Sequence, residues 1–391
     1  MDDLFFELIQ VSIGNRQSLT RIPTVDEWLW LYKMSQKQTL TGVCFRGVER
    51  LCRDMPEQTA NLHDGLKIHW IASAVNIRQR NVELNECCSK LQATLSEDGF
   101  DSCVLKGQGV ASLYFSRSLN ESEDDIPLAL LRQPGDIDIW VAGGMKRAYR
   151  YCIERFHSVA FDYVNAHTPF CSDVEVELHW RAMVEPNLFL NRKMQRWQSG
   201  KDVRSMMLSG KAKLVTGEEL TVPVWEFNAF YMMFHCYHHM FESGLGLRQL
   251  MDYYFVLLSA PDTSVVVKDR VVSLFREFKM MRFSSAIMWI MEYVFGLNEQ
   301  FLLCTADEKE GRFILNEVMT GGNFGHHDRR IRKIGNGKLQ FALSNVQHNW
   351  GLARHYPGEF FWTPIWLAWH WIWKRCFLMM ESVGHIGTRK E

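Results

Sequence analysis

The stretch Gly135-Asp136-Ile137-Asp138-Ile139-Trp140-Val141 decides the fold of this chain. Its polar and apolar residues alternate, which is typical of a β-strand with one face toward the core. Asp136 and Asp138 therefore project from the same face, about 7 Å apart along the backbone. Such a D-x-D pair also occurs on solvated sheet faces, so its meaning depends on the segments around it.

A short buried strand is predicted before this stretch, at residues 103–105. It ends at the turn Lys106-Gly107-Gln108-Gly109, and we expect a helix over residues 110–115 to follow. Backbone amides at the start of a helix can hold an anion, and a lysine adds a point charge. The alternative is a plain strand-to-helix turn with a solvated Lys106.

A second alternating stretch follows at residues 174–180, Val-Glu-Val-Glu-Leu-His-Trp. It predicts another strand with Glu175, Glu177 and His179 on one face. Between the two stretches we expect a helix over residues 145–156 and a further strand over 159–164. The middle of the chain is therefore predicted to be α+β, with a short mixed sheet and helices.

Apolar residues recur at helical spacing on both sides of this segment. We therefore predict three parts: a helical N-terminal region at 1–98, an α/β core at 99–222 and a helical C-terminal domain at 223–391. The C-terminal helices are expected at residues 227–241, 247–258, 265–278 and 284–295.

The overall composition excludes several classes of protein. Hydrophobic residues make up 47% and charged residues 23% of the 391 residues, as in soluble globular proteins. Lys and Arg number 44 against 45 Asp and Glu, so we expect no strong general nucleic-acid binding. The one dense basic run is at residues 329–333. The N-terminus lacks the features of a secretory signal, which predicts a cytoplasmic protein with reduced cysteines.

A tryptophan-rich segment lies at residues 360–380. His370, Lys374 and Arg375 interrupt it, so its uncharged part is too short for a membrane span. We expect a helix that packs on its own protein. A membrane-surface helix or a partner-docking face is the alternative.

The acidic strands suggest a metal-dependent chemistry. Two carboxylates on one strand and a third from a neighbouring strand suit Mg²⁺ or Mn²⁺, which take oxygen ligands and leave positions for water and phosphate. The residues alone leave Glu175 and Glu177 as rivals for the third position. This pattern indicates phosphoryl or nucleotidyl transfer.

The order of strand, glycine turn, helix, G-D-I-D and acidic strand resembles the nucleotidyltransferase superfamily related to DNA polymerase β. A closer likeness rests on Leu105-Lys106-Gly107, Leu113-Tyr114, Arg132 with Gly135-Asp136-Ile137-Asp138, Glu177-Leu178-His179-Trp180, and Gly246-Leu247-Arg248 with Asp252. This run resembles an uncharacterised bacterial nucleotidyltransferase family close to the AbiEii-type and MenT-type nucleotidyltransferases. The resemblance implies a minimal nucleotidyltransferase core at residues 99–222. It also implies that Asp136, Asp138 and Glu177 are the catalytic, metal-binding carboxylates, and it favours Glu177 over Glu175.

The resemblance also implies nucleotide-binding residues: Lys106, Gly107, Gln108, Arg132, Gly135 and Arg248. The superfamily's usual Gly-Ser turn is replaced here by Lys106-Gly107-Gln108, which puts that phosphate contact in question. For Arg132 the alternative is an ion pair with the acidic residues 121–125. For Arg248 it is a helical salt bridge with Asp252, four residues on.

Three histidines, His235, His238 and His239, raise the possibility of a zinc site. No H-E-x-x-H motif and no nearby third ligand accompany them. We therefore interpret them as core or cleft histidines.

The sequence thus predicts an Mg²⁺- or Mn²⁺-dependent nucleotidyltransferase. It would transfer a nucleoside monophosphate from an NTP to a hydroxyl acceptor and release pyrophosphate. Two alternatives remain: a D-x-D glycosyltransferase that uses a nucleotide sugar, and an inactive nucleotide-binding or regulatory module. The base of the NTP, the acceptor (small molecule, protein or RNA end), catalytic competence and oligomeric state are left open.

Overall fold

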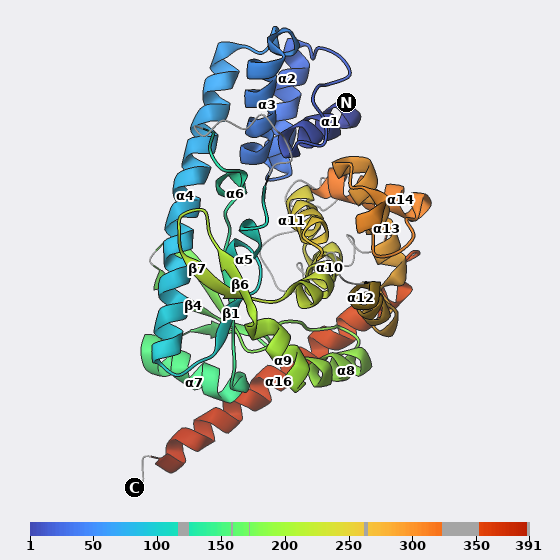
Figure 1. Cartoon of the computed structure of the whole chain (residues 1–391). Coiled ribbons are helices and arrows are strands. Elements are labelled where there is room, and N and C mark those ends of the chain that lie inside the picture. Colours follow the sequence, from blue (N-terminus) through green and yellow to red (C-terminus); the bar gives the residue numbers. More distant parts are fainter. Residues whose placement is uncertain (116–124, 158, 172, 262–264, 323–351, 389–391) are drawn as a thin grey trace, which may run out of the picture.

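A five-stranded mixed sheet forms the middle of the chain in the computed structural model, in the order β1-β2-β5-β4-β3 (Figure 1). The structure describes residues 1–115, 125–157, 159–171, 173–261, 265–322 and 352–388. The basic run at 329–333 and most of the acidic segment 121–125 lie outside these ranges. Helices surround the sheet, which confirms the predicted α+β class. The predicted boundaries of the three parts stay predictions.

The two acidic strands lie side by side in the sheet. Strand β2 (Ile137–Val141) runs parallel to β5 (Val174–His179), and Asp138 is opposite Glu177 in their register. The remaining pairs are antiparallel. They involve the three other strands, β1 (Ser102–Val104), β3 (Ala160–Phe161) and β4 (Asn165–Cys171).

The alternation along β2 and β5 separates an apolar face from a polar one. Ile137, Ile139 and Val141 belong to a core cluster that also includes Leu84 and Ala148, from helices α4 (Asp64–Glu97) and α7 (Gly144–Phe156). Asp138 and Glu177 therefore point to the opposite face. Because side chains along a strand alternate between its two faces, the carboxylates of Asp138 and Glu177 lie together on one face of the sheet.

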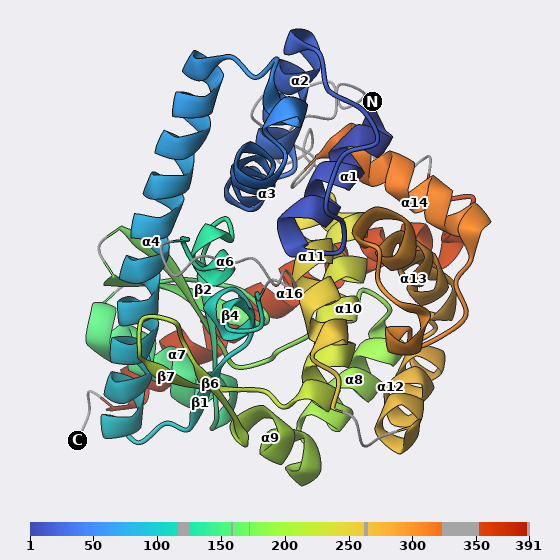
Figure 2. The same ribbon diagram turned by 45° about the horizontal axis from the view of Figure 1, so that its top comes forward.

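The N-terminal helices lie at one end of the molecule, and α4 runs from them to the sheet (Figures 1 and 2). Its early turns pack against α3, and its later turns pack against β1 and β7. The helices of this end are α1 (Asp2–Ile13), α2 (Val25–Lys37), α3 (Thr41–Asp54) and the short η1 (Pro56–Thr59).

The C-terminal helices pack beside the N-terminal ones, with α1 against α13. The four predicted helices are confirmed as α10 (Trp225–Glu242), α11 (Leu247–Leu258), α12 (Val265–Glu277) and α13 (Met281–Phe295). They are followed by η2 (Glu299–Phe301) and α14 (Glu308–Gly321).

The tryptophan-rich segment forms the long helix α16 (Pro357–Thr388), which runs along the lower side of the molecule in Figure 1. Tyr163, between β3 and β4, makes edge contacts with Trp366, Trp369 and Trp373. Phe377 packs against Phe161 of β3. The expected packing on its own protein is therefore confirmed. No helix in the described residues is long and apolar enough to cross a membrane.

Several elements were not predicted. Strand β4 reads Asn-Ala-His-Thr-Pro-Phe-Cys, without the alternation that marks β2 and β5. The hairpin of β6 (Gly210–Lys213) and β7 (Glu219–Val222) is short, with four residues in each strand. Helices α6 (Leu128–Leu131), α8 (Leu188–Gln198) and α9 (Lys201–Leu208) were not predicted either. The helix predicted at residues 110–115 is instead α5 (Gln108–Ala111), which begins earlier and is shorter.

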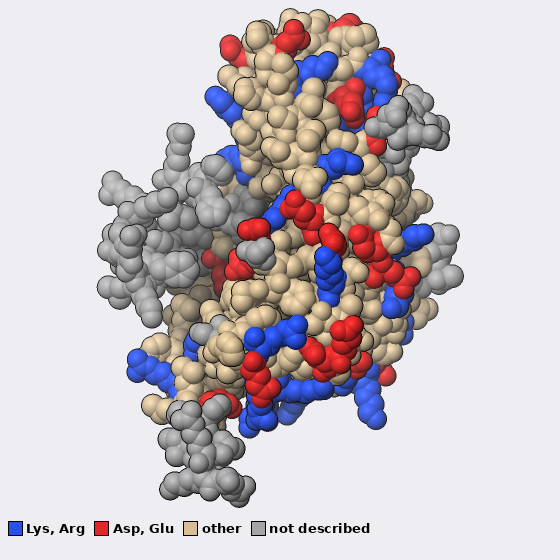
Figure 3. Space-filling view, turned by 90° about the vertical axis from the view of Figure 1, so that its left-hand side faces the viewer, with Lys and Arg blue, Asp and Glu red and all other residues tan. Residues whose placement is uncertain are grey.

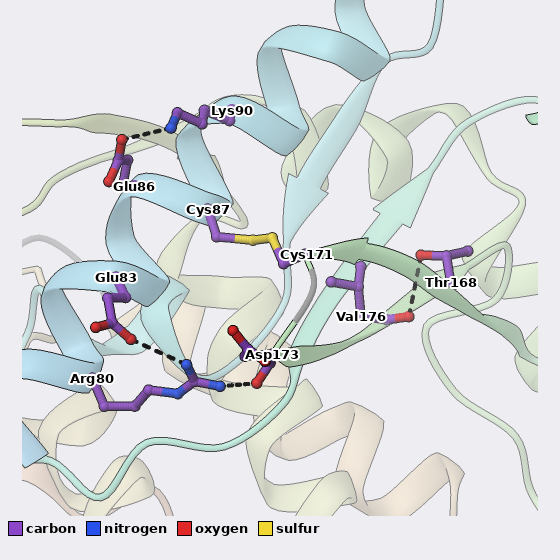
Figure 4. Close-up of a disulfide and its surroundings, with 9 residues drawn as sticks. All are labelled: Arg80, Glu83, Glu86, Cys87, Lys90, Thr168, Cys171, Asp173 and Val176. Atoms are coloured by element: carbon purple, nitrogen blue, oxygen red, sulfur yellow. Dashed lines mark hydrogen bonds and ion pairs between the residues drawn. A yellow bond between two sulfur atoms is a disulfide. The ribbon is translucent and has the colours of Figure 1, made fainter. Parts of the chain in front are cut away.

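A disulfide joins Cys87 of α4 to Cys171 at the end of β4 (Figure 4). Arg80 on the same helix donates a hydrogen bond to the backbone carbonyl of Asp173 and forms an ion pair with Glu83. The bridge and the arginine together hold the end of β4 and Asp173 against α4. The expectation that all cysteines are reduced is wrong for this pair, because the fold brings together residues that are 84 positions apart.

Removal of this disulfide is expected to lower the free energy of unfolding by about 2–4 kcal/mol, because the bridge restricts a long loop in the unfolded chain. The measurement is chemical unfolding of the wild type with and without dithiothreitol, compared with Cys87→Ser/Cys171→Ser. The reductant should lower the unfolding midpoint of the wild type only. An equal effect on the double variant would assign the loss to another cause.

Charged side chains of both signs are intermixed on the face that Figure 3 shows, the left-hand side of Figure 1 where α4 lies. Among the described residues visible there, no region of one sign dominates. This agrees with the balanced composition.

Candidate active site

The polar face of the sheet brings three sequence-predicted residues together. Asp138 and Glu177 lie on adjacent parallel strands, which run about 4.8 Å apart. His179 connects them: its Nε2 is 3.0 Å from Asp138 Oδ1 and 3.1 Å from Glu177 Oε2. Asn165 of β4 donates a further hydrogen bond to Glu177 at 2.6 Å. The carboxylates are therefore oriented by neighbours on two strands, β4 and β5.

Lys106 lies beside the same carboxylates because it follows β1, the neighbour of β2. Its Nζ is 3.1 Å from Asp138 Oδ2 and 3.6 Å from Asp136 Oδ2. Asp138 is almost fully buried, whereas the Asp136 side chain is 31% exposed. The pair thus has one interior and one accessible carboxylate.

Several side chains of this cluster have shifted pKa values. Burial alone would lower the pKa of His179, but its bonds to Asp138 and Glu177 outweigh burial and raise the pKa to about 9. Burial opposes ionisation of Glu177, yet His179 and Lys106 lower its pKa. For Lys106 the three carboxylates outweigh burial and raise the pKa. His179 and Lys106 are therefore cations at neutral pH.

The turn after β1 brings the backbone close to the acidic strand. Gly107 has φ +60°, and a Cβ there would lie 3.4 Å from the carbonyl oxygen of Asp136. The Gln108 side chain points away from the carboxylates and donates a 2.5 Å hydrogen bond to Asn85 of α4. Only Lys106 of this turn lines the site cavity described below. A phosphate contact by Gly107 and Gln108 stays a prediction.

Glu175 and Glu177 occupy different environments. Glu175 is 63% exposed and pairs with His167 at 2.7 Å. Glu177 is 20% exposed and lines the cavity beside Asp138. The geometry therefore favours Glu177 as the third carboxylate.

A cavity of about 450 Å³ opens in front of the carboxylates. One wall is the sheet face, with Lys106, Asp136, Asp138 and Glu177. The other walls come from segments distant in the sequence: Asp162, Tyr163, Asn165 and His167 around the β3–β4 turn, Tyr231, His235, His238, His239 and Glu242 of α10, and Trp366, Leu367 and His370 of α16. The sequence pattern did not indicate that α16 contributes to this site.

The histidines of α10 face this cavity, in agreement with the interpretation as core or cleft residues. Burial lowers the pKa of His239 to about 3 and places the pKa of His235 well below its usual value, with Lys106 adding to both effects. These two imidazoles are therefore neutral near pH 7. His238 differs, because Glu242 lies 2.7 Å away and raises its pKa against the effect of burial.

Arg132 does not line the cavity. Its guanidinium forms two hydrogen bonds of 2.7 and 2.8 Å with Asp252 of α11, and Tyr114 donates a third to the same carboxylate at 2.6 Å. Arg132 is only 3% exposed. The acidic residue near it in the sequence, Asp125, pairs instead with Arg46 and Arg53. Arg132 therefore connects the segment before Gly135 to helix α11.

Arg248 supports the same segment from α11. Its Nη1 is 3.4 Å from the carbonyl oxygen of Gln133, and a Cβ on Gly135 would lie 3.0 Å from that nitrogen. Glycine at position 135 thus permits the close approach of the arginine. Nucleotide binding by Arg132, Gly135 and Arg248 stays a prediction, and the contacts show how these residues position Asp136.

The donor set suits a divalent metal ion. Potential ligand atoms of Asp138, Glu177 and His179 lie within 4.8 Å of one another, and those of His167, Glu175 and Glu177 form a second such group. These are the two groups found among the described residues, and neither contains a histidine of α10. Because His179 is protonated at neutral pH, the first group offers its two carboxylates. Carboxylate oxygens predominate, and Asp136 adds one more at the cavity wall. Such oxygen donors fit Mg²⁺ or Mn²⁺ better than zinc.

The fold and site together define an α+β protein with a carboxylate-lined cavity on the polar face of a short mixed sheet. A family model described as an uncharacterised nucleotidyltransferase matches residues 24–296. The chain therefore belongs to this nucleotidyltransferase family. Comparisons with curated proteins and with solved structures each returned no significant match.

Proposed function

We propose that the protein transfers a nucleoside monophosphate from an NTP to a hydroxyl acceptor and releases pyrophosphate. The observation that carries this proposal is the convergence of Asp136, Asp138 and Glu177 on one cavity that also contains Lys106. Membership of the nucleotidyltransferase family supports the same reaction class.

Asp136, Asp138 and Glu177 would hold Mg²⁺ or Mn²⁺ in this reaction. When bound, such an ion neutralises phosphate charge and lowers the pKa of a coordinated hydroxyl. Buried Asp138 supplies a fixed carboxylate, since His179 and Lys106 restrain both of its oxygens. The more exposed Asp136 is accessible to a nucleotide that enters the cavity.

The remaining side chains position the substrates. Lys106 adds a cation beside the carboxylates, within reach of a triphosphate. His179 bonds to both Asp138 and Glu177 and so fixes the distance between the two strands' carboxylates. Catalysis then depends on positioning and charge neutralisation rather than on a covalent intermediate.

Calorimetry with the four NTPs and Mg²⁺ or Mn²⁺, together with an assay of pyrophosphate release, tests this function. We expect metal-dependent binding of at least one NTP, and loss of that binding in Asp136→Asn/Asp138→Asn. Both changes retain side-chain size, and circular dichroism checks that the variant folds.

The products distinguish the competing functions. Pyrophosphate supports nucleotidyl transfer, whereas a free nucleoside diphosphate from a nucleotide sugar would indicate a glycosyltransferase. Binding without turnover would indicate a regulatory module, in line with the replacement of the usual Gly-Ser turn. Absence of metal and nucleotide binding would contradict the proposal.

A further inference from the structure

A second cavity, the α8 groove, lies next to the site. It has a volume of about 490 Å³ and is lined by Tyr163, Leu188, Asn191, Arg192, Gln195, Arg196, Ser199 and Trp369. Among the described residues that line it, the two charged ones are arginines and none carries a carboxylate. The groove therefore has the opposite charge to the carboxylate cavity.

No ion pair among the described residues neutralises the charge of Arg192 or Arg196. They are four residues apart on α8, so both lie on one helix face. Both are exposed, and neither side chain has an ion-pair partner within the part of the chain that the structure describes. Lys193, the cation between them, pairs instead with Glu277 at 3.0 Å. Two like charges at this spacing repel each other, and a bound anion would relieve that repulsion.

Tyr163 connects the groove to the candidate active site, because its side chain lines both cavities. It is fixed in place: its carbonyl accepts a hydrogen bond from Trp180, and the guanidinium of Arg181 lies 4.0 Å from its ring centre. Two residues later, Asn165 donates its hydrogen bond to Glu177. The backbone from Tyr163 to Asn165 spans about 7 Å. The groove therefore begins close to a residue that contacts Glu177, the third carboxylate.

We propose that the α8 groove binds the acceptor, and that the acceptor carries a nucleoside phosphate. Arginines suit phosphate because their planar donors match its oxygens, and the partly exposed ring of Trp369 offers a surface for a base. This assignment rests on the proposed nucleotidyl transfer. It places the phosphate of the acceptor on Arg192 and Arg196, and its hydroxyl toward Glu177. The source is either the end of an RNA strand or a free mononucleotide.

The test uses fluorescence anisotropy of the full-length protein with a labelled single-stranded RNA 12-mer, at several salt concentrations. In Arg192→Gln/Arg196→Gln we expect at least tenfold weaker binding and a salt slope reduced by about 1.4, the value for two lost phosphate contacts on a single strand. The matched control is Arg78→Gln/Arg150→Gln. It removes the same charge from exposed positions on α4 and α7, and its RNA affinity should stay within about twofold of wild type.

Competition with 5′-AMP distinguishes the two sources of the nucleoside phosphate. Displacement of the RNA at matched phosphate concentration assigns a mononucleotide acceptor, and displacement only by a longer strand assigns an RNA end. Equal loss in both double variants, or no loss in either, would overturn the proposal.

NTP binding separates this proposal from the proposed function. Arg192→Gln/Arg196→Gln should bind NTP and metal like the wild type, because neither arginine lines the carboxylate cavity. If the wild type binds NTP but not RNA or AMP, the acceptor assignment fails and the proposed function stands. If it binds RNA through these arginines but binds no NTP, the groove is not an acceptor site.

Discussion

Glu177→Gln is expected to lower the rate of pyrophosphate release about 10²- to 10³-fold, an effect typical of removing one electrostatic group from an active site. Glu177 is one of the carboxylates that line the cavity, and it is held by His179 and Asn165. The amide keeps the shape of the side chain but removes the negative charge. The affinity for Mn²⁺, measured by electron paramagnetic resonance, should fall as well.

Glu175→Gln is the matched control for this prediction. It neutralises the same kind of side chain two residues away on β5, where Glu175 is exposed and pairs with His167. We expect its rate and Mn²⁺ affinity to stay within about twofold of wild type. A larger loss in Glu175→Gln than in Glu177→Gln would reverse the assignment of the third carboxylate.

Arg132→Met is expected to lower the free energy of unfolding by about 3–5 kcal/mol, because the buried Asp252 carboxylate loses its ion pair with Arg132. Both side chains of this ion pair are 4% exposed. Urea unfolding followed by circular dichroism measures the loss. Asp252→Leu combined with Arg132→Met should recover part of the stability, since the double variant leaves neither charge of the pair unmatched.

Arg53→Met provides the comparison for a partly exposed ion pair. Its side chain is 34% exposed and pairs with Asp54 and Asp125. Surface pairs of this kind contribute about 0–1 kcal/mol. If Arg132→Met and Arg53→Met have equal effects, the buried pair does not hold the segment before Gly135 as we describe.

The local alternation in the sequence was enough to predict β2, β5 and the shared face of Asp136 and Asp138. The register that places Asp138 opposite Glu177 could not be derived in the same way. It depends on the crossover through α7, β3 and β4, and β4 has no alternating pattern. The resemblance to known nucleotidyltransferases favoured Glu177, and the geometry gives a physical reason for that preference.

Long-range contacts limited the prediction of the rest of the site. The sequence suggested Arg248 as the partner of Asp252, because residues four apart meet on a helix. In the structure Arg132, which is 120 positions away, donates two hydrogen bonds to Asp252. The contribution of α16 to the cavity is of the same kind. Helical periodicity predicts that a segment is a helix but does not specify which distant surface it covers.

The place of α16 in the cavity wall has a consequence for the order of protein synthesis. Trp366, Leu367 and His370 are translated long after the carboxylate strands. Because domains generally fold from the N-terminal side as the chain emerges from the ribosome, the sheet can form while this wall is still missing. A growing polypeptide therefore carries the carboxylates on an open surface, and the cavity takes its final shape only when α16 has left the ribosome.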